Sequence, residues 1–142
     1  MTQPDPCPCG SGRAFATCCG PYLAGSVLPE TAEALMRSRY TAYARRDGAY
    51  LSATWHPTTR RADLGLDEPV KWAGLEILST EAGGPTDTRG KVEFIARYKV
   101  GGRAQRLHEV SRFQRREGRW LYVDGDLAPA AGDTGGDAGE GA

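Results

Sequence analysis

The stretch CPCGSGRAFATCCG, residues 7–20, contains all four cysteines of the 142-residue chain. One residue separates Cys7 from Cys9, and Cys18 and Cys19 follow as an adjacent pair after eight intervening residues. This spacing brings four thiols close enough to bind one tetrahedral zinc ion. Because four thiolates leave no coordination position for water or substrate, the pattern predicts a structural site and not a catalytic one.

The residues between the cysteines suit a metal site. Gly10, Ser11 and Gly12 predict a turn with little crowding at Cβ, whose backbone N–H groups can donate to the sulfur atoms. Arg13 adds a positive charge near a centre whose formal charge would be about −2. We expect Phe15 to cover one side of this centre.

A disulfide framework is the alternative, because an even number of cysteines in a short chain also allows it. A redox dithiol is a further alternative. The first residues, MTQPDPCPCG, lack a basic segment followed by an apolar one, so they do not predict export. Cytosolic thiols are normally kept reduced. We therefore favour zinc and expect a cytoplasmic protein.

The pattern C-x-C-G-S-G, five residues, then C-C-G resembles the SEC-C motif, the zinc-binding module found at the C-terminus of the SecA translocation ATPase and in many small bacterial proteins. Three further segments are similar to the YchJ-type family of uncharacterised bacterial proteins: ALMRSRYTAYARRD (34–47), ATWHP (53–57) and LHEVSRFQRREGRWLYVDG (107–125). The resemblance implies a SEC-C module over residues 1–28, joined to a nuclear-transport-factor-2-like domain over residues 29–127. It implies no settled activity.

Composition and charge argue against two classes, nucleic-acid-binding proteins and membrane-spanning proteins. Eighteen basic and eighteen acidic residues give a net charge of zero. Three of the acids lie in residues 128–142, APAAGDTGGDAGEGA, a tail without large apolar residues that is predicted to be disordered. The remaining eighteen bases and fifteen acids give about +3, too little to predict nucleic-acid binding by itself. No apolar run approaches the ~20 residues of a membrane span.

Helices are expected first and strands afterwards. Residues 31–46 lack Gly and Pro and place apolar side chains on one helical face. A second helix over residues 49–55 is expected to begin after Asp47 and Gly48 and to end before Pro57. Alternating patterns separated by glycine-containing turns predict strands over residues 71–80, 91–100, 103–115 and 119–124. This order predicts an α+β fold, with an N-terminal zinc knuckle followed by a cone-like domain of helices packed on a curved antiparallel sheet.

A pocket between the concave face of such a sheet and the helices is the second candidate site. Glu109 and Ser111 share one face of the third strand with large apolar residues, as expected for a pocket wall with a few polar groups. Glu109 is the possible base, with Tyr40, His56 or Asp124 as polar partners. The candidate lining residues are Tyr40, Tyr43, Trp55, His56, Glu109, Ser111, Trp120, Tyr122 and Asp124.

Each of these residues also has a structural interpretation. Tryptophan and tyrosine commonly lie in cores with the polar atom at the edge. Glu109 can instead pair with Arg37, Arg39 or Arg97 and fix the helix on the sheet. Two histidines at unrelated positions form no visible Ser/His/Asp or hydrolase-type metal arrangement, and no phosphate-binding G-x-x-x-x-G-K-[ST] loop occurs.

The arginines leave the partner open. Fifteen of the eighteen basic residues are arginine, which suits phosphate and carboxylate recognition, but acids are scattered among them as on a solvated mixed surface. We expect an adaptor or binding protein whose knuckle docks a protein or ribosomal partner. A small-molecule binder or enzyme using the pocket is the alternative, and an RNA-binding protein is less favoured. Residues 21–29 can act as a hinge or as a tether for the knuckle.

Overall fold

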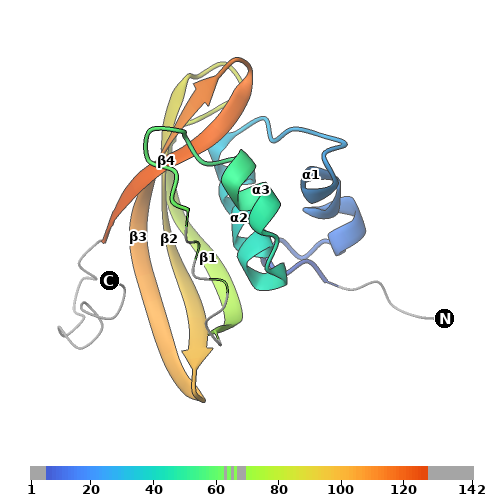
Figure 1. Cartoon of the computed structure of the whole chain (residues 1–142), viewed down its shortest axis with the longest axis vertical. Helices are drawn as coiled ribbons and strands as arrows, with labels where there is room; N and C mark the ends of the chain where they lie inside the picture. The colour runs from blue at the N-terminus through green and yellow to red at the C-terminus, as the bar shows by residue number, and fades with distance from the viewer. Residues whose placement is uncertain (1–5, 63, 65, 67–69, 128–142) are drawn as a thin grey trace.

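The computed structural model describes residues 6–127 except 63, 65 and 67–69 (Figure 1). The tail for which we predict disorder, residues 128–142, lies outside this range. A cysteine-rich module, residues 6–24, comes first and is followed by two helices and a four-stranded sheet. The elements are the 3₁₀ helix η1 (Phe15–Thr17), helices α1 (Gly20–Ala24), α2 (Ala32–Arg45) and α3 (Gly48–Ala53), and strands β1 (Val70–Ala82), β2 (Arg89–Val100), β3 (Arg103–Arg116) and β4 (Arg119–Leu127).

The helices begin at the residues that the sequence suggests. Thr31 Oγ1 accepts a hydrogen bond from the Ala34 N–H (3.0 Å) at the start of α2. Asp47 caps α3 in the same way, since its carboxylate accepts from the Tyr50 N–H (3.1 Å). Helix α3 ends two residues earlier than expected, because the chain around Trp55 leaves the helix to pair with Tyr122 of β4.

The sheet is an antiparallel meander in chain order, as predicted. The expected turns at Gly101-Gly102 and Glu117-Gly118 have left-handed backbone at both residues, with φ of 58° and 80° in the first and 54° and 80° in the second. Two consecutive left-handed residues match the right-handed twist of the strands that they join. The turns therefore fix the register that the alternation of side chains requires.

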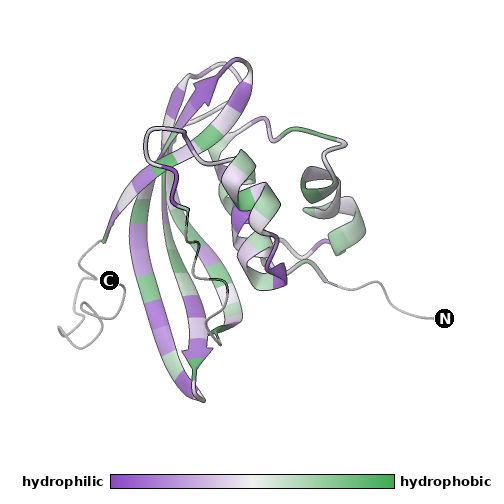
Figure 2. Cartoon of the chain, in the orientation of Figure 1, coloured by the Kyte–Doolittle hydropathy of each residue, from purple (hydrophilic) through white to green (hydrophobic). Residues whose placement is uncertain are grey.

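The helices pack on the concave face of the curved sheet, and α1 lies on the side of α2 away from the sheet (Figure 1), while the loop that carries Gly10 reaches β1. Apolar and polar residues alternate along the strands (Figure 2). The module shares the buried core of the domain. Core members include Cys7, Cys9, Cys19, Leu35, Met36, Tyr40, Val92, Phe94, Phe113 and Trp120. The predicted α+β class is confirmed.

Among the described residues, no helix is both long enough and apolar enough to cross a membrane.

Candidate metal centre

The four cysteine sulfurs meet at one point. All lie within 4.8 Å of one another. The Sγ atoms of Cys9 and Cys18 are 3.6 Å apart, and those of Cys18 and Cys19 are 4.0 Å apart. All four cysteines are free thiols. Four sulfurs around a tetrahedral ion with bonds of about 2.3 Å are about 3.8 Å from one another. The cluster therefore has the dimensions of a tetrahedral thiolate site.

Backbone hydrogen bonds shape the loop that carries the first two cysteines. The Cys7 N–H donates to the Arg13 carbonyl (2.9 Å), and the Gly10 N–H donates to the Cys7 carbonyl (3.2 Å). Gly10 and Gly12 have φ of 77° and 86°, a conformation that favours glycine. Gly10 also lies against β1, where a Cβ would come within 3.2 Å of the Leu75 carbonyl oxygen.

The second pair of cysteines stands at the start of α1. The Leu23 N–H donates to the Cys19 carbonyl (3.0 Å) and continues the helix from that residue. Phe15 packs against the cluster that contains the cysteines, as expected for a residue covering one side. The guanidinium carbon of Arg45, at the end of α2, lies 3.8 Å from the centre of the Phe15 ring.

Helix α2 supplies contacts that the sequence does not reveal. Thr41 is fully buried, and its hydroxyl oxygen lies 3.3 Å from Cys19 Sγ and 3.6 Å from Cys7 Sγ. One turn earlier, Arg37 donates to the Cys9 carbonyl (2.9 Å). Residues 37 and 41 lie on one helical face, so this i, i+4 spacing is the signal that could have suggested the contact. The module is therefore held against α2.

Hydrogen bonds among the four thiols and burial shift their pKa values in opposite directions. Hydrogen bonding, chiefly with Cys19, holds the pKa of Cys9 at about 4. The same interaction raises the pKa of Cys19, and burial raises that of Cys18. A divalent cation at the centre of the cluster would stabilise all four sulfurs as thiolates.

On the concave face of the sheet, three candidate pocket residues do come together. The Ser111 hydroxyl donates to Glu109 Oε2 (2.8 Å), and the Tyr122 hydroxyl donates to the same oxygen (3.4 Å). Burial raises the pKa of Glu109, and these hydrogen bonds offset part of that effect. Gly125 leaves the necessary room, because a Cβ there would overlap the Glu109 carboxylate.

The alternative ion pairs of Glu109 are not formed. Arg39, 3% exposed, donates to the Leu51 carbonyl (2.9 Å) and to Thr54 Oγ1 (2.7 Å) at the end of α3. Arg37 and Arg97 bind other carboxylates, at 3.1 Å and 3.3 Å. Burial lowers the pKa of Arg39. The Leu51 carbonyl and the Thr54 hydroxyl accept from its guanidinium, which also lies over the rings of Trp55 and Tyr122, so this arginine has a structural role.

Several other candidates serve packing. The Tyr40 hydroxyl accepts from the Gly74 N–H (2.8 Å). The rings of Tyr40 and Tyr43 pack on Trp72, with centres 5.6 Å and 5.9 Å away. Trp120 is buried and donates to the Glu30 carbonyl (3.1 Å). These contacts are those of core aromatic residues.

Two candidates lie where the chain passes from α3 to β4. The guanidinium of Arg39 sits over the ring of Trp55, 5.0 Å from its centre, and the indole N–H of Trp55 is buried without an acceptor among the described residues. The His56 backbone N–H donates to the Tyr122 carbonyl (2.8 Å), while its imidazole Nδ1 lies 2.8 Å from the Thr58 hydroxyl. The imidazole is therefore engaged within its own loop.

Asp124 lies apart from the other candidates. Arg112 of β3 pairs with Asp124, whereas the next residue, Phe113, pairs with Tyr122, so β4 carries Val123 as an extra residue. Arg112 Nε donates to the Asp124 carboxylate (2.6 Å) on the outer face of the sheet. The expectation that Asp124 lines the pocket together with Tyr122 is wrong, because one extra residue in β4 inverts the alternation beyond it.

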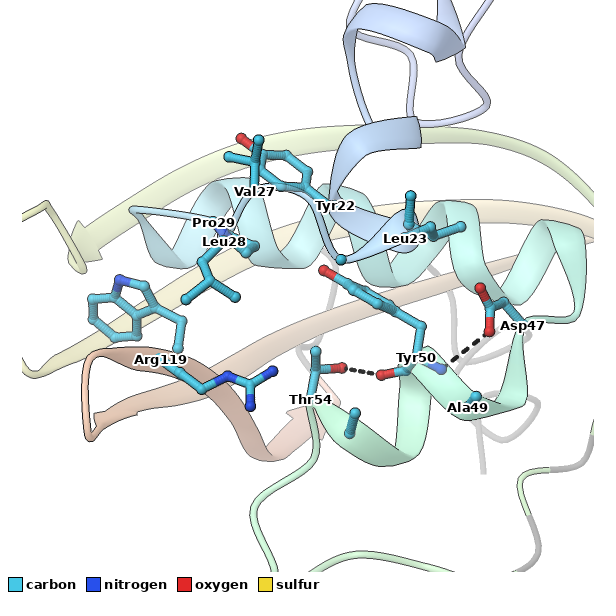
Figure 3. Close-up of a pocket in the computed structure, with 14 residues that line it drawn as sticks. Tyr22, Leu23, Val27, Leu28, Pro29, Asp47, Ala49, Tyr50, Thr54 and Arg119 are labelled. Atoms are coloured by element: carbon cyan, nitrogen blue, oxygen red, sulfur yellow. Dashed lines mark hydrogen bonds between the residues drawn. The ribbon is translucent and has the colours of Figure 1, made fainter.

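A groove of about 280 Å³ lies between the cysteine-rich module and the rest of the fold (Figure 3). Its lining is mostly apolar and aromatic. Two of its apolar side chains, Val27 and Leu28, are 48% and 47% exposed. The groove cannot be seen in the sequence, because it exists only once the module is placed. Its walls include Tyr22, Leu23, Val27, Leu28, Pro29, Asp47, Ala49, Tyr50, Arg119 and Trp120.

The fold and the cysteine cluster define a protein that joins a SEC-C motif to an NTF2-like domain. Residues 4–21 match the model of the SEC-C motif, and residues 31–125 match a YchJ-like model described as "YchJ, middle NTF2-like domain". The chain therefore belongs to the YchJ-like family, as its sequence motifs suggest.

Relatives and solved structures agree with this assignment. A UPF0225 protein of Chromobacterium violaceum is 57% identical over 126 residues, which cover 86% of this chain and 93% of the relative. The solution structure of a SEC-C motif containing protein from Rhodopseudomonas palustris has a TM-score of 0.77 and 38% identity, covering 87% of this chain and 98% of that one. The crystal structure of a SEC-C motif containing protein from Psychrobacter arcticus has a TM-score of 0.70 and 25% identity, and the match covers 90% of this chain and 84% of that one.

Proposed function

We propose that this protein is a zinc-stabilised binding protein that docks an apolar segment of a protein partner, such as a ribosomal protein, in the groove beside its SEC-C module. The observation that carries the proposal is the origin of the groove: one wall is α1, which starts directly after the metal-ligand pair Cys18 and Cys19. Metal binding would hold this wall in place. Four cysteines kept as thiols need reducing surroundings, so the proposal places the protein in the cytoplasm.

Zinc is proposed because tetrahedral coordination by four thiolates is typical of structural zinc sites. The cysteines would then be oriented by hydrogen bonds from Thr41, Ser11 and Arg37, as outer contacts orient the ligands in such sites. Native mass spectrometry of untagged protein from a reducing cytosol tests this step. We expect one zinc per chain, lost on acidification as four titratable thiols appear. A protein two or four hydrogens lighter and free of metal would contradict it.

A protein partner is favoured over nucleic acid by the composition of the groove. Arg119 is the one cation among the described residues that line it. Near the last hairpin, Arg112 is occupied by the Asp124 and Asp126 carboxylates, and Arg115 donates to the Gly84 carbonyl (3.1 Å). Nucleic-acid sites need several available cations, and their affinity falls steeply with salt. Exposed aliphatic and aromatic side chains in a groove instead suit an apolar peptide segment.

The docking step is tested by site-specific photo-crosslinking in cells. A crosslinker at position 28 is expected to capture one defined partner. The matched control is position 78, because Leu78 is 41% exposed on β1 and does not line the groove. The purified partner should then bind wild-type protein and Leu78→Asp but lose binding to Leu28→Asp. Equal capture at both positions, or equal binding of both variants, would refute the docking proposal.

A small-molecule role for the concave face is the second candidate, supported by Glu109. This half-buried carboxyl has a raised pKa and lies beside Tyr122, in contact with no guanidinium among the described residues. Perturbed carboxyls of this kind are common in functional sites. A ligand co-purifying with wild-type protein but not with Glu109→Gln, seen as additional bound mass, would support this role. If no ligand co-purifies with the wild-type protein and cells carrying Glu109→Gln have a normal phenotype, the small-molecule role would be contradicted.

A further inference from the structure

The four sulfurs of the candidate metal centre differ in accessibility. Cys7, Cys9 and Cys19 are 5%, 0% and 1% exposed. Cys18 alone is half-buried. It borders a pocket of about 340 Å³ between the module and the start of α2, which the buried Cys19 also lines. Any reagent approaching the centre from solvent therefore meets the sulfur of Cys18 first.

The pocket in front of Cys18 is lined by charged side chains. Two guanidinium groups, those of Arg13 and Arg37, line it together with the carboxylate of Glu33. Arg13 is held by the Thr17 carbonyl, and Arg37 by Glu33 and the Cys9 carbonyl. Cations beside the reacting sulfur can stabilise the anion that leaves during its reaction.

A second sulfur stands close enough to complete an oxidation. Cys9 Sγ lies 3.6 Å from Cys18 Sγ, the shorter of the two contacts that Cys18 makes with other sulfurs at 3.6 Å and 4.0 Å. The other sulfur belongs to Cys19, whose Cα is only about 3.8 Å away along the chain, whereas disulfides usually join Cα atoms about 4.4–6.8 Å apart. Cys9 is therefore the better partner. The Ser11 hydroxyl, 3.1 Å from Cys18 Sγ, can hydrogen-bond to the reacting sulfur.

We propose that Cys18 is a peroxide-modification site and that Cys9 is its resolving residue. The Cys18 thiolate attacks one oxygen of hydrogen peroxide, so that an S–O bond forms, the O–O bond breaks and hydroxide leaves. The Cys9 thiolate then attacks the Cys18 sulfur, forming the disulfide and expelling a second hydroxide. Two sulfurs give up two electrons to one peroxide. The remaining pair, Cys7 and Cys19, is a poor site for zinc, so the ion is released.

This inference rests on the proposed zinc site, so the experiment measures the two separately. Zinc-loaded full-length protein is first assayed for metal, which tests the proposed function alone. It is then treated with less than one equivalent of hydrogen peroxide. Released zinc is followed with a chromogenic chelator, remaining thiols are alkylated, and peptides are mapped by mass spectrometry. We expect Cys18 to be modified first, a Cys9–Cys18 disulfide to accumulate, and one zinc to be released per disulfide.

Modification that begins at Cys7 or Cys19, equal modification of all four cysteines, or zinc release without a disulfide containing Cys18 would overturn the proposal. A variant that keeps every ligand provides the second measurement. Arg13→Gln is expected to slow the peroxide reaction roughly threefold, the size of one exposed charge contribution. Arg103→Gln is the matched control, because Arg103 is exposed at the start of β3 and lies outside the Cys18 pocket, so its rate should equal that of wild type. Equal rates in both variants would show that the cationic pocket has no part in the reaction.

Discussion

Thr41 is the residue through which the candidate metal centre and the NTF2-like domain meet. Its hydroxyl is buried on α2 and contacts the sulfurs of Cys7 and Cys19. Such outer contacts orient metal ligands and offset their charge. A buried hydroxyl needs a hydrogen-bond partner, and the two sulfurs supply it here.

Replacing Thr41 by valine should weaken zinc binding while preserving shape. We expect a loss of about 10- to 100-fold in zinc affinity, the range found when an outer ligand contact is removed. Competition with a chelator of known affinity measures it. Thr41→Ser keeps the hydroxyl and should retain most of the affinity. Unchanged affinity in Thr41→Val would mean that the hydroxyl contributes nothing to the centre.

The buried carboxyl of Glu109 should make the free energy of unfolding depend on pH. Burial raises the pKa of Glu109 above its ordinary value of 4.5. The folded state therefore holds this proton more tightly than the unfolded state, and the free energy of unfolding decreases as pH rises above the unfolded pKa. Glutamine cannot ionise, yet its amide oxygen can accept from Ser111 and Tyr122. Glu109→Gln should consequently gain stability relative to wild type between about pH 4 and about pH 7.

Urea unfolding of both proteins at the two pH values measures this difference. Comparing the variant with wild type cancels the pH dependence of metal binding, which both proteins share. A difference in unfolding free energy that stays constant or reverses with pH would show that the Glu109 carboxyl is as well solvated in the folded state as in the unfolded chain.

At the scale of elements, α2 connects three parts of the molecule. One face holds the cysteine cluster through Arg37 and Thr41, another packs Tyr40 on β1, and the N-terminus docks on the β1–β2 hairpin. At the hairpin, the Ala32 N–H donates to the Gly83 carbonyl (2.9 Å). This close approach needs small residues on all sides.

The docking of α2 on the hairpin should fail when Gly90 gains a side chain. A Cβ at Gly90 would lie 2.5 Å from Gly83 Cα and 3.2 Å from Ala32 Cβ. Because the obstacle is backbone, Gly90→Ala should cost about 1–3 kcal/mol of unfolding free energy. Gly84→Ala is the control: its Cβ meets only the Asp87 carboxylate at 3.4 Å, and the expected cost is below about 0.5 kcal/mol. Equal costs would contradict the predicted clash.

At the scale of the whole molecule, the cysteine-rich module and the domain share one core. Cys7, Cys9 and Cys19 belong to the same buried cluster as Leu35 of α2 and Phe113 of β3. A site shared in this way contributes its binding free energy to the stability of the entire fold.

Removing the metal should therefore destabilise the domain and not the module alone. We expect a strong chelator to cost at least about 3 kcal/mol, or about 10 °C in Tm for a chain of this size. Thermal unfolding with and without chelator gives the Tm. Hydrogen exchange shows where protection is lost, and it should fall in α2 as well as in residues 6–24. Loss confined to the module would mean that the two parts unfold independently.

Sequence alone determined the elements and the grouping of the four cysteines, because both depend on local spacing. The positions of the cysteines predict a four-thiol site. The helix around Leu35, the four strands and the turns at Gly101-Gly102 and Glu117-Gly118 follow from period and turn chemistry, and the structure confirms them.

Only the tertiary structure decided which residues those elements bring together. One extra residue, Val123, moves Asp124 to the outer face, and alternation cannot reveal a bulge. The contact of Thr41 with the sulfurs, the structural role of Arg39 and the groove at Leu28 all join residues far apart in the chain. Such contacts depend on how the module settles on α2, and that position is set by the packing of the common core, which no local pattern encodes.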